Sequence, residues 1–247
     1  MATISNTSAH TLCPLSFVTT PNYEANLRTL LTLIQTAQTN SILVAPEVCL
    51  TGFDYENLDA VLNFFPHAIE AIKKNSIDKT VIVTLIEKRE SHVFNMLKIF
   101  HNGEVVYERA KAKLFRLGEE HKHFDEGEEQ HVEIVEVDGI KIGVLICFEL
   151  RFKGLWKRLE GADVIAVPSW WGAPRAEHFS TLTKALAVMN QCYVIATDSQ
   201  NEACTKISRV ITPQGKEFPK GNNSCSEVVY DKKEIALMRR YLDVGIG

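Results

Sequence analysis

The stretch IKIGVLICFELRFKGLWKRLEGADVIAVPSW (140–170) decides the fold. It begins and ends with a short run that is apolar on both faces, which is typical of a strand buried inside an α/β protein. Between the two runs, Leu155 and Leu159 favour a short helix, and Gly161 is a suitable C-cap for it. The stretch therefore predicts a strand–helix–strand unit.

The flanking sequence continues in the same way, as a mixture of strand–helix–strand units and hairpins. We expect helices over 23–37, 60–75 and 175–190, and strands over 41–48, 80–90, 92–100, 105–111, 131–137, 192–199, 207–213 and 226–230. The pair Asn102-Gly103 predicts a tight hairpin turn, because both residues tolerate a positive φ. Since no linker or break in composition interrupts the pattern, residues 1–247 are expected to form one α/β domain with a mixed sheet.

Composition excludes several classes of protein. The chain has 247 residues, 45% of them hydrophobic, which is enough for a large core, and its formal charge of −4 comes without a basic stripe that could bind nucleic acid. No segment approaches the run of about 18 apolar residues that a membrane span needs. The first residues lack a basic start followed by an apolar run, so no secretory signal is expected and the protein is predicted to be cytoplasmic. Six cysteines occur without CxxC spacing, so we expect no metal site.

Three polar residues stand at or beyond the ends of predicted strands: Glu47, Lys113 and Cys147. The carboxyl ends of strands are the usual place for a binding or catalytic site in an α/β sheet. A glutamate after an apolar strand is costly to bury alone, so Glu47 and Lys113 could form a structural ion pair. The alternative is that the three residues form a catalytic set.

That catalytic set suits the hydrolysis of an amide, whose carbonyl is a poor electrophile. A thiolate is a strong nucleophile when its pKa is lowered, and the start of a helix after Cys147 together with an ammonium group would lower it. The carboxylate of Glu47 could take the thiol proton and later activate water. The ammonium of Lys113 and the backbone N–H of Phe148 could stabilise the oxyanion. Glu47, Lys113 and Cys147 would thus suffice without a metal or a cofactor.

At these residues the chain resembles the nitrilase-like carbon–nitrogen hydrolases. The resemblance is carried by APEVCLTGFDYE (45–56), KAKLFRLGEEHKHFDEG (111–127) and IGVLICFELRFKGLWKRLEGADVIAVPSW (142–170), in the order that the family has them. Further likeness lies in APRAEHFSTLTKALAVMNQCYVIAT (173–197) and MRRYLDVG (238–245), so that it covers nearly the whole chain. Three such motifs in order are specific, although each one alone is weak.

The resemblance implies a four-layer α-β-β-α sandwich with mixed sheets, paired into a homodimer or a larger homo-oligomer. It also implies Glu47 as general base, Lys113 as oxyanion stabiliser and Cys147 as nucleophile. The family carries a second glutamate in the loop after the lysine. The position that matches it is Glu120, with Glu119 as the alternative, and its implied role is to orient the lysine and the substrate.

Within the family, LFRLGEEHKHFDEG (114–127) and WWGAPRAEHF (170–179) are most similar to the ω-amidases, which remove ammonia from short keto-acid amides. A substrate that is an acid needs a cation in the pocket. Arg175 and Arg151 are candidates for this role, and a structural salt bridge is the alternative for each.

Other positions near the nucleophile carry weaker signals. Trp170 and Trp171 follow a buried strand and could wall the pocket, or Trp170 could belong to the core, since alternation along a strand sends the two to opposite faces. Phe148-Glu149 stands where the family often has Tyr-Asp, which keeps the type of charge.

The predicted function is therefore cysteine-dependent hydrolysis of a small linear amide through a thioester, with release of ammonia and no cofactor. The expected partner is a small-molecule amide, with no nucleic acid and no membrane. Two alternatives remain: an N-carbamoyl amino-acid amidohydrolase similar to β-ureidopropionase, and a non-catalytic homologue that binds a metabolite.

Overall fold

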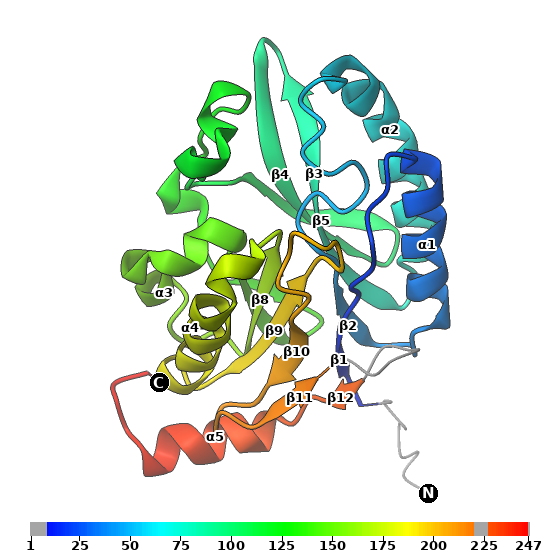
Figure 1. The fold of residues 1–247 in the computed structure, drawn as a ribbon. Coiled ribbons are helices and arrows are strands. Elements are labelled where there is room, and N and C mark those ends of the chain that lie inside the picture. The colour runs from blue at the N-terminus through cyan, green and yellow to red at the C-terminus, as the bar shows by residue number, and fades with distance from the viewer. Residues whose placement is uncertain (1–8, 220–226, 247) are drawn as a thin grey trace, which may run out of the picture.

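Two six-stranded sheets lie face to face in the computed structural model, and helices cover their outer faces (Figure 1). The structure describes residues 9–219 and 227–246. In order across sheet A, the strands are β12 (Val228–Val229), β1 (Thr11–Pro14), β2 (Ser41–Val44), β3 (Lys79–Arg89), β4 (His92–His101) and β5 (Glu104–Ala110). In order across sheet B, they are β11 (Glu217–Pro219), β10 (Ser208–Ile211), β9 (Tyr193–Asp198), β8 (Val164–Ser169), β7 (Ile140–Val144) and β6 (Val135–Val137).

Each sheet is mixed, with a parallel centre. In sheet A, β1, β2 and β3 run parallel, and β4, β5 and β12 continue the sheet antiparallel to their neighbours. In sheet B, β7, β8 and β9 run parallel, and β6, β10 and β11 pair antiparallel. Because parallel strands end at the same edge of a sheet, the segments that follow β2, β7 and β8 are brought toward one region.

Helices α1 (Tyr23–Thr36) and α2 (Leu58–Asn75) cover the outer face of sheet A. Along β2, Leu43 packs with these helices, whereas Ile42 and Val44 point into the space between the sheets. This alternation is the period of two that a strand requires when both of its faces are buried. The side chain of Asn22 caps α1 by accepting from the backbone N–H of Ala25 at 2.9 Å.

Helices α3 (Lys153–Arg158) and α4 (Ala176–Met189) cover the outer face of sheet B, and α5 (Lys232–Tyr241) follows near the end of the chain. Phe179 and Leu186 of α4 are fully buried in the same core cluster as the strands of sheet B. Five short 3₁₀ helices complete the described secondary structure: η1 (Arg116–Gly118), η2 (Glu120–Lys122), η3 (Glu129–His131), η4 (Cys147–Arg151) and η5 (Ala173–Arg175). The expected α-β-β-α sandwich with mixed sheets is confirmed.

Local predictions fail mainly at the ends of strands. The strand expected over 41–48 ends at Val44, and the strand expected at the start of the stretch 140–170 ends at Val144, so two residues of irregular chain precede both Glu47 and Cys147. Of the strand expected over 131–137, only the last three residues form a strand, which is β6. Strand β1 and helix α5 were not predicted. Strand β1 has only four residues, which is too short for a prediction from periodicity.

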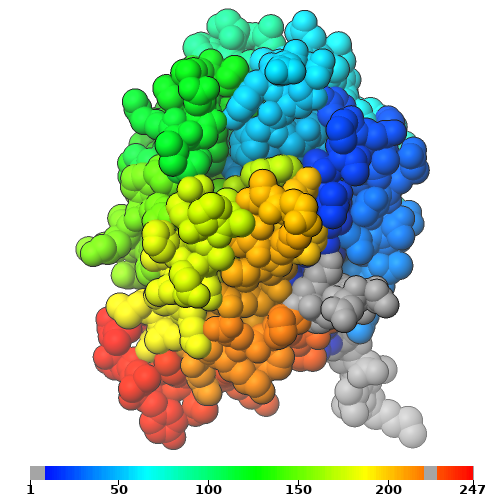
Figure 2. Space-filling model, in the orientation of Figure 1, coloured from blue at the N-terminus to red at the C-terminus, as the bar shows by residue number. Residues whose placement is uncertain are grey.

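Segments that are distant in the sequence are joined on the face seen in Figure 2, where chain from the blue end of the scale lies against orange chain. The backbone N–H of Thr19 donates to Asn201 at 2.9 Å, and Asn201 donates back to the Thr19 carbonyl at 2.8 Å.

Within residues 9–219 and 227–246, no helix is both long and apolar enough to cross a membrane.

Candidate active site

Glu47 lies in the irregular chain after β2 and is fully buried between the two sheets. Its backbone N–H donates to the carbonyl of Ser169 at the end of β8, at 3.2 Å. Its Oε1 accepts from Lys111 Nζ at 2.7 Å and from Asn95 Nδ2 at 2.9 Å. Its Oε2 is buried and accepts no hydrogen bond from the described residues, so one oxygen of this carboxylate remains available as a base.

The lysine beside Glu47 is Lys111, and the prediction that Lys113 occupies this place is wrong. Lys111 is fully buried, and its Nζ lies between the carboxylates of Glu47 and Glu120, with the two Glu120 oxygens at 2.8 and 2.9 Å. Lys113 is partly exposed and pairs with Glu129 at the surface. The physical reason is the end of β5 at Ala110, because the first residue beyond it still lies between the sheets and the third has reached the surface.

Glu120, rather than Glu119, is the second glutamate of the site. Its side chain is only 5% exposed, and its Oε2 also accepts from the backbone N–H of Phe115 at 3.1 Å. Glu119 has a positive φ of 60°, points outward and pairs with Lys122. These adjacent residues thus face opposite ways at the start of η2.

Cys147 lies in the turn after β7 and has a φ of +45°, in the left-handed region that side chains other than glycine seldom adopt. Such a conformation costs about 1–2 kcal/mol, and it persists only where the surrounding structure holds it. Here it directs the side chain toward the other sheet, where Glu47 and Lys111 lie. Only 7% of Cys147 is exposed, so little of its surface is open to a substrate.

Burial dominates the electrostatics of the cysteine, and the expectation of a lowered thiol pKa is wrong. Burial raises the pKa of Cys147 well above its usual range, and the charge of Glu47 raises it further. The Lys111 ammonium and the backbone N–H of Trp170 lower the pKa of Cys147 without reversing the shift. The resting residue is therefore a neutral thiol, and it needs a base before it can attack.

The carboxylate nearby is suited to be that base. Burial raises the pKa of Glu47 to about 7, against the lowering effect of Lys111 and with a further contribution from Glu120. The Cys147 thiol lies near enough to lower the pKa of Glu47 slightly. Burial disfavours the charge on Lys111, but the carboxylates of Glu47 and Glu120 outweigh it and raise the pKa of Lys111, which stays protonated.

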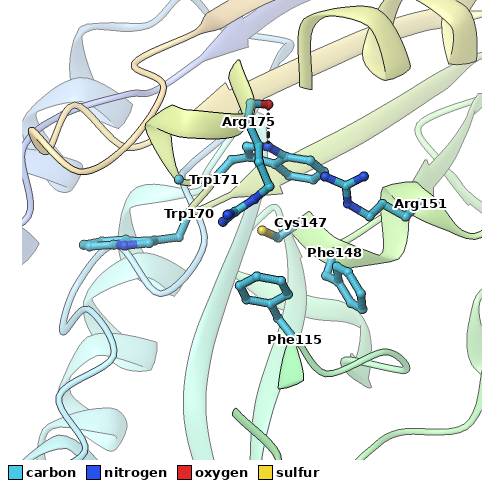
Figure 3. A pocket seen from close by; sticks show the side chains of 8 residues that line it. Phe115, Cys147, Phe148, Arg151, Trp170, Trp171 and Arg175 are labelled. Carbon is cyan, nitrogen blue, oxygen red and sulfur yellow. Dashed lines mark hydrogen bonds between the residues drawn. The ribbon is translucent and has the colours of Figure 1, made fainter. Parts of the chain in front are cut away.

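A small cavity opens at Cys147 (Figure 3). Its lining residues are Phe115, Cys147, Phe148, Arg151, Trp170, Trp171, Gly172 and Arg175. Both tryptophans line it, and they differ in their surroundings. Trp171 is buried and packs on Phe179 of the core, whereas Trp170 is half-buried and packs edge-on against Phe53.

Two arginines flank the cavity. The guanidinium of Arg175 lies over the Phe115 ring at 5.2 Å, and that of Arg151 lies over the Trp171 ring at 4.8 Å. The backbone of Arg175 also holds Trp171, whose ring N–H donates to the Arg175 carbonyl at 2.9 Å (Figure 3). Arg151 contacts His178 Nδ1 at 3.0 Å. Across the described ranges, neither arginine forms an ion pair with a carboxylate, so the structural salt bridge considered for each is absent there.

Two residues of this site were missed by sequence reasoning. The signal for Lys111 was its position as the last residue of the strand predicted over 105–111, which Lys113 does not share. The signal for Asn95 was an amide inside the apolar strand HVFNMLKIF (92–100), since a buried polar group needs a partner. In the described part of the chain, no three His, Cys, Asp or Glu side chains are grouped to hold a metal ion.

Comparison with known proteins assigns this site to a family. The family model for carbon-nitrogen hydrolase matches residues 11–232, which include every residue named above at the site. The chain belongs to the carbon-nitrogen hydrolase family. This hydrolase is 32% identical over 193 residues to the 2-oxoglutaramate amidase of Bacillus subtilis (strain 168), with 73% of each chain covered. It is 27% identical over 228 residues to omega-amidase YafV of Escherichia coli (strain K12), with 88% of this chain and 86% of YafV covered.

Solved structures share the fold of this chain. Nit3 of Saccharomyces cerevisiae, a member of branch 10 of the nitrilase superfamily, matches with a TM-score of 0.81 at 21% identity, over 95% of this chain and 94% of Nit3. The resemblance to the nitrilase-like hydrolases, close to the ω-amidase branch, is thereby confirmed. Membership of this family makes the protein a carbon-nitrogen hydrolase.

Proposed function

We propose that this hydrolase cleaves a small linear amide through a thioester on Cys147, with Glu47, Lys111 and Glu120 as its catalytic partners. The observation that carries the proposal is the placement of Lys111 Nζ between the carboxylates of Glu47 and Glu120, close enough to Cys147 for these three charges to act on the pKa of its thiol. Lys111 takes the role that the sequence analysis gave to Lys113.

The steps follow from the protonation states. Oε2 of Glu47 takes the thiol proton as the sulfur of Cys147 attacks the amide carbon. Lys111 and the backbone N–H of Phe148 stabilise the oxyanion. The proton on Glu47 passes to the amide nitrogen, the C–N bond breaks and ammonia leaves. Water then gives a proton to Glu47 and attacks the thioester, which releases the acid and restores the thiol.

The rate of this reaction should depend on pH through Glu47. Since the pKa of Glu47 is about 7 and the base must be ionised, kcat/KM should rise as the pH increases from 5 to 7 and level off above that value. Deprotonation of Lys111 should not lower kcat/KM below pH 9, because the pKa of Lys111 is raised. The measurement is ammonia release against pH, with circular dichroism showing that the protein stays folded throughout. A rate independent of pH between 5 and 8 would rule out Glu47 as the base.

We further infer that the substrate is an acid, such as the monoamide of a short dicarboxylic acid. Arg151 and Arg175 bring two positive charges to the cavity, and in the described ranges neither meets a carboxylate of the protein. After burial, it is the charge of Arg175 that most lowers the pKa of Arg151, so a bound carboxylate would relieve repulsion between the two. The amidase relatives support the same class of substrate, since one is named for 2-oxoglutaramate.

This inference predicts a specific loss of affinity. Arg175→Met should raise KM for succinamic acid about 10- to 100-fold, because a hydrogen bond to a charged group contributes about 1.5–3 kcal/mol. The same variant should leave the turnover of butyramide, which has no carboxylate, within about twofold. Arg28→Met, on the exposed face of α1, is the control that removes a charge elsewhere. Equal losses on both substrates would show that Arg175 supports the fold of the cavity rather than the substrate.

An N-carbamoyl amino acid also carries a carboxylate and would fit the two arginines. The two substrate classes differ in their products, since a carbamoyl substrate releases carbon dioxide as well as ammonia. Measuring the ammonia and the carbon dioxide released from a panel of amides and carbamoyl amino acids distinguishes the two substrate classes. The homodimer or larger assembly and the cytoplasmic location implied above remain predictions.

A further inference from the structure

A buried ion pair lies behind the active site, outside the cavity. Arg109 in β5 donates to Glu149 in η4 through two parallel bonds, Nη1 to Oε1 at 2.8 Å and Nη2 to Oε2 at 2.6 Å. The two side chains are 2% and 0% exposed. Because β5 belongs to sheet A and η4 follows β7 of sheet B, the pair joins the two sheets.

The remaining hydrogen bonds of Glu149 hold two backbone N–H groups. Its Oε1 accepts from Ala112, the residue after Lys111, at 2.7 Å. Its Oε2 accepts from Ile146, the residue before Cys147, at 2.7 Å. One carboxylate thus binds the chain next to the lysine and the chain next to the nucleophile.

The remaining hydrogen bonds of Arg109 hold two carbonyl groups in the same segments. Its Nη1 donates to Ala110, the residue before Lys111, at 3.1 Å. Its Nη2 donates to Val144, the last residue of β7, at 2.9 Å. Among the described residues, the side-chain hydrogen bonds of the Arg109–Glu149 pair therefore end either within the pair or on the backbone that flanks Lys111 and Cys147.

This distribution separates the pair from an ordinary core ion pair. Burial of two charges brings little net stability, because loss of hydration offsets their attraction. A bidentate arginine–carboxylate pair does impose a definite geometry. Sheet A carries Glu47 and Lys111, whereas sheet B carries Cys147, so the distance from the thiol to its base depends on how the sheets are aligned. Misplacement of reacting groups by about 1 Å can cost roughly 100-fold in rate.

We propose that Glu149, held by Arg109, is a positioning residue that sets the distance between Cys147 and the Glu47–Lys111 pair. The inference rests on the proposed function, in which these groups exchange a proton. It also accounts for the positive φ of Cys147, since Glu149 ties the turn on the N-terminal side of that residue to the opposite sheet.

The test is Glu149→Gln, which keeps the shape and removes the charge. Each oxygen of Glu149 accepts from two donors, so an NH₂ group at either place would face two N–H groups and release one catalytic segment. We expect kcat for amide hydrolysis to fall at least about tenfold while KM stays within about threefold. Glu149→Asp retains the charge and should recover part of the loss.

A second readout does not depend on turnover. The rate at which iodoacetamide alkylates Cys147, followed against pH by peptide mass spectrometry, reports the charges around the thiol. In Glu149→Gln, the pH at the midpoint of the alkylation profile should move by at least about half a unit, because Glu47 and Lys111 no longer lie at the same distance from the Cys147 thiol. Glu217→Gln is the matched control, since Glu217 pairs with Arg209 in sheet B and contacts neither catalytic segment; it should leave both readouts unchanged.

The outcomes distinguish the two proposals. If the wild-type protein releases no ammonia from any amide, the proposed function fails, and the alkylation midpoint still tests the role of Glu149. If the wild type is active and Glu149→Gln keeps both its kcat and its midpoint, the positioning role is overturned and the function stands. A loss of kcat that only matches the unfolded fraction seen by circular dichroism, with an unchanged midpoint, also overturns it.

Discussion

Cys147→Ala is expected to reduce ammonia release by at least about 1,000-fold, because in the proposed mechanism the sulfur forms the bond to the substrate and no other group in the cavity can replace it. The substitution removes one buried atom, and the turn keeps its other contacts, so the protein should remain folded. The measurement is ammonia release under single-turnover conditions, together with a thermal melt.

Cys192→Ala is the matched control for that experiment. Cys192 is buried and free, as Cys147 is, but it precedes β9 and does not line the cavity. It should retain most of the activity. Rapid quenching of the wild type during turnover should add the mass of one acyl group to the peptide that contains Cys147. Substantial turnover by Cys147→Ala would contradict the thioester mechanism.

Lys111→Met is expected to have the second large effect, and Lys113→Met almost none. Removal of Lys111 leaves two buried carboxylates without a cation, which should lower the free energy of unfolding by about 3–5 kcal/mol. It should also lower kcat/KM at least about 100-fold through the lost oxyanion stabilisation. Lys113 pairs with a surface carboxylate and lies over the Phe152 ring, so its removal should change stability by no more than about 1 kcal/mol.

The two lysine variants control for each other, because they make the same substitution two residues apart. Chemical denaturation gives the stabilities, and ammonia release gives kcat/KM at a temperature where both variants are folded. A larger loss in Lys113→Met than in Lys111→Met would restore the original prediction and contradict the structure.

Much of the fold could be predicted because its signals are local. Helix α1 ends within one residue of its prediction, since the spacing of Leu27, Leu30 and Ile34 and the cap at Asn22 lie within a few turns of chain. The turn at Asn102-Gly103 has a positive φ at both residues, as expected from side-chain sterics alone. Helix α5 escaped prediction because its exposed face is strongly charged and only Ile235 is fully buried.

The candidate site was predictable in part, for the same reason. The sequence alone determined that Glu47 and Cys147 follow buried strands and that a lysine lies on the segment after β5. Only the tertiary structure decided that this lysine is Lys111, because β5 ends at Ala110 and the chain has reached the surface by Lys113. It also decided that the second glutamate is Glu120, because the adjacent Glu119 faces the opposite way. It also decided that the thiol is neutral at rest. Burial and the charges of distant segments set the pKa of Cys147, and neither is written in the residues beside it.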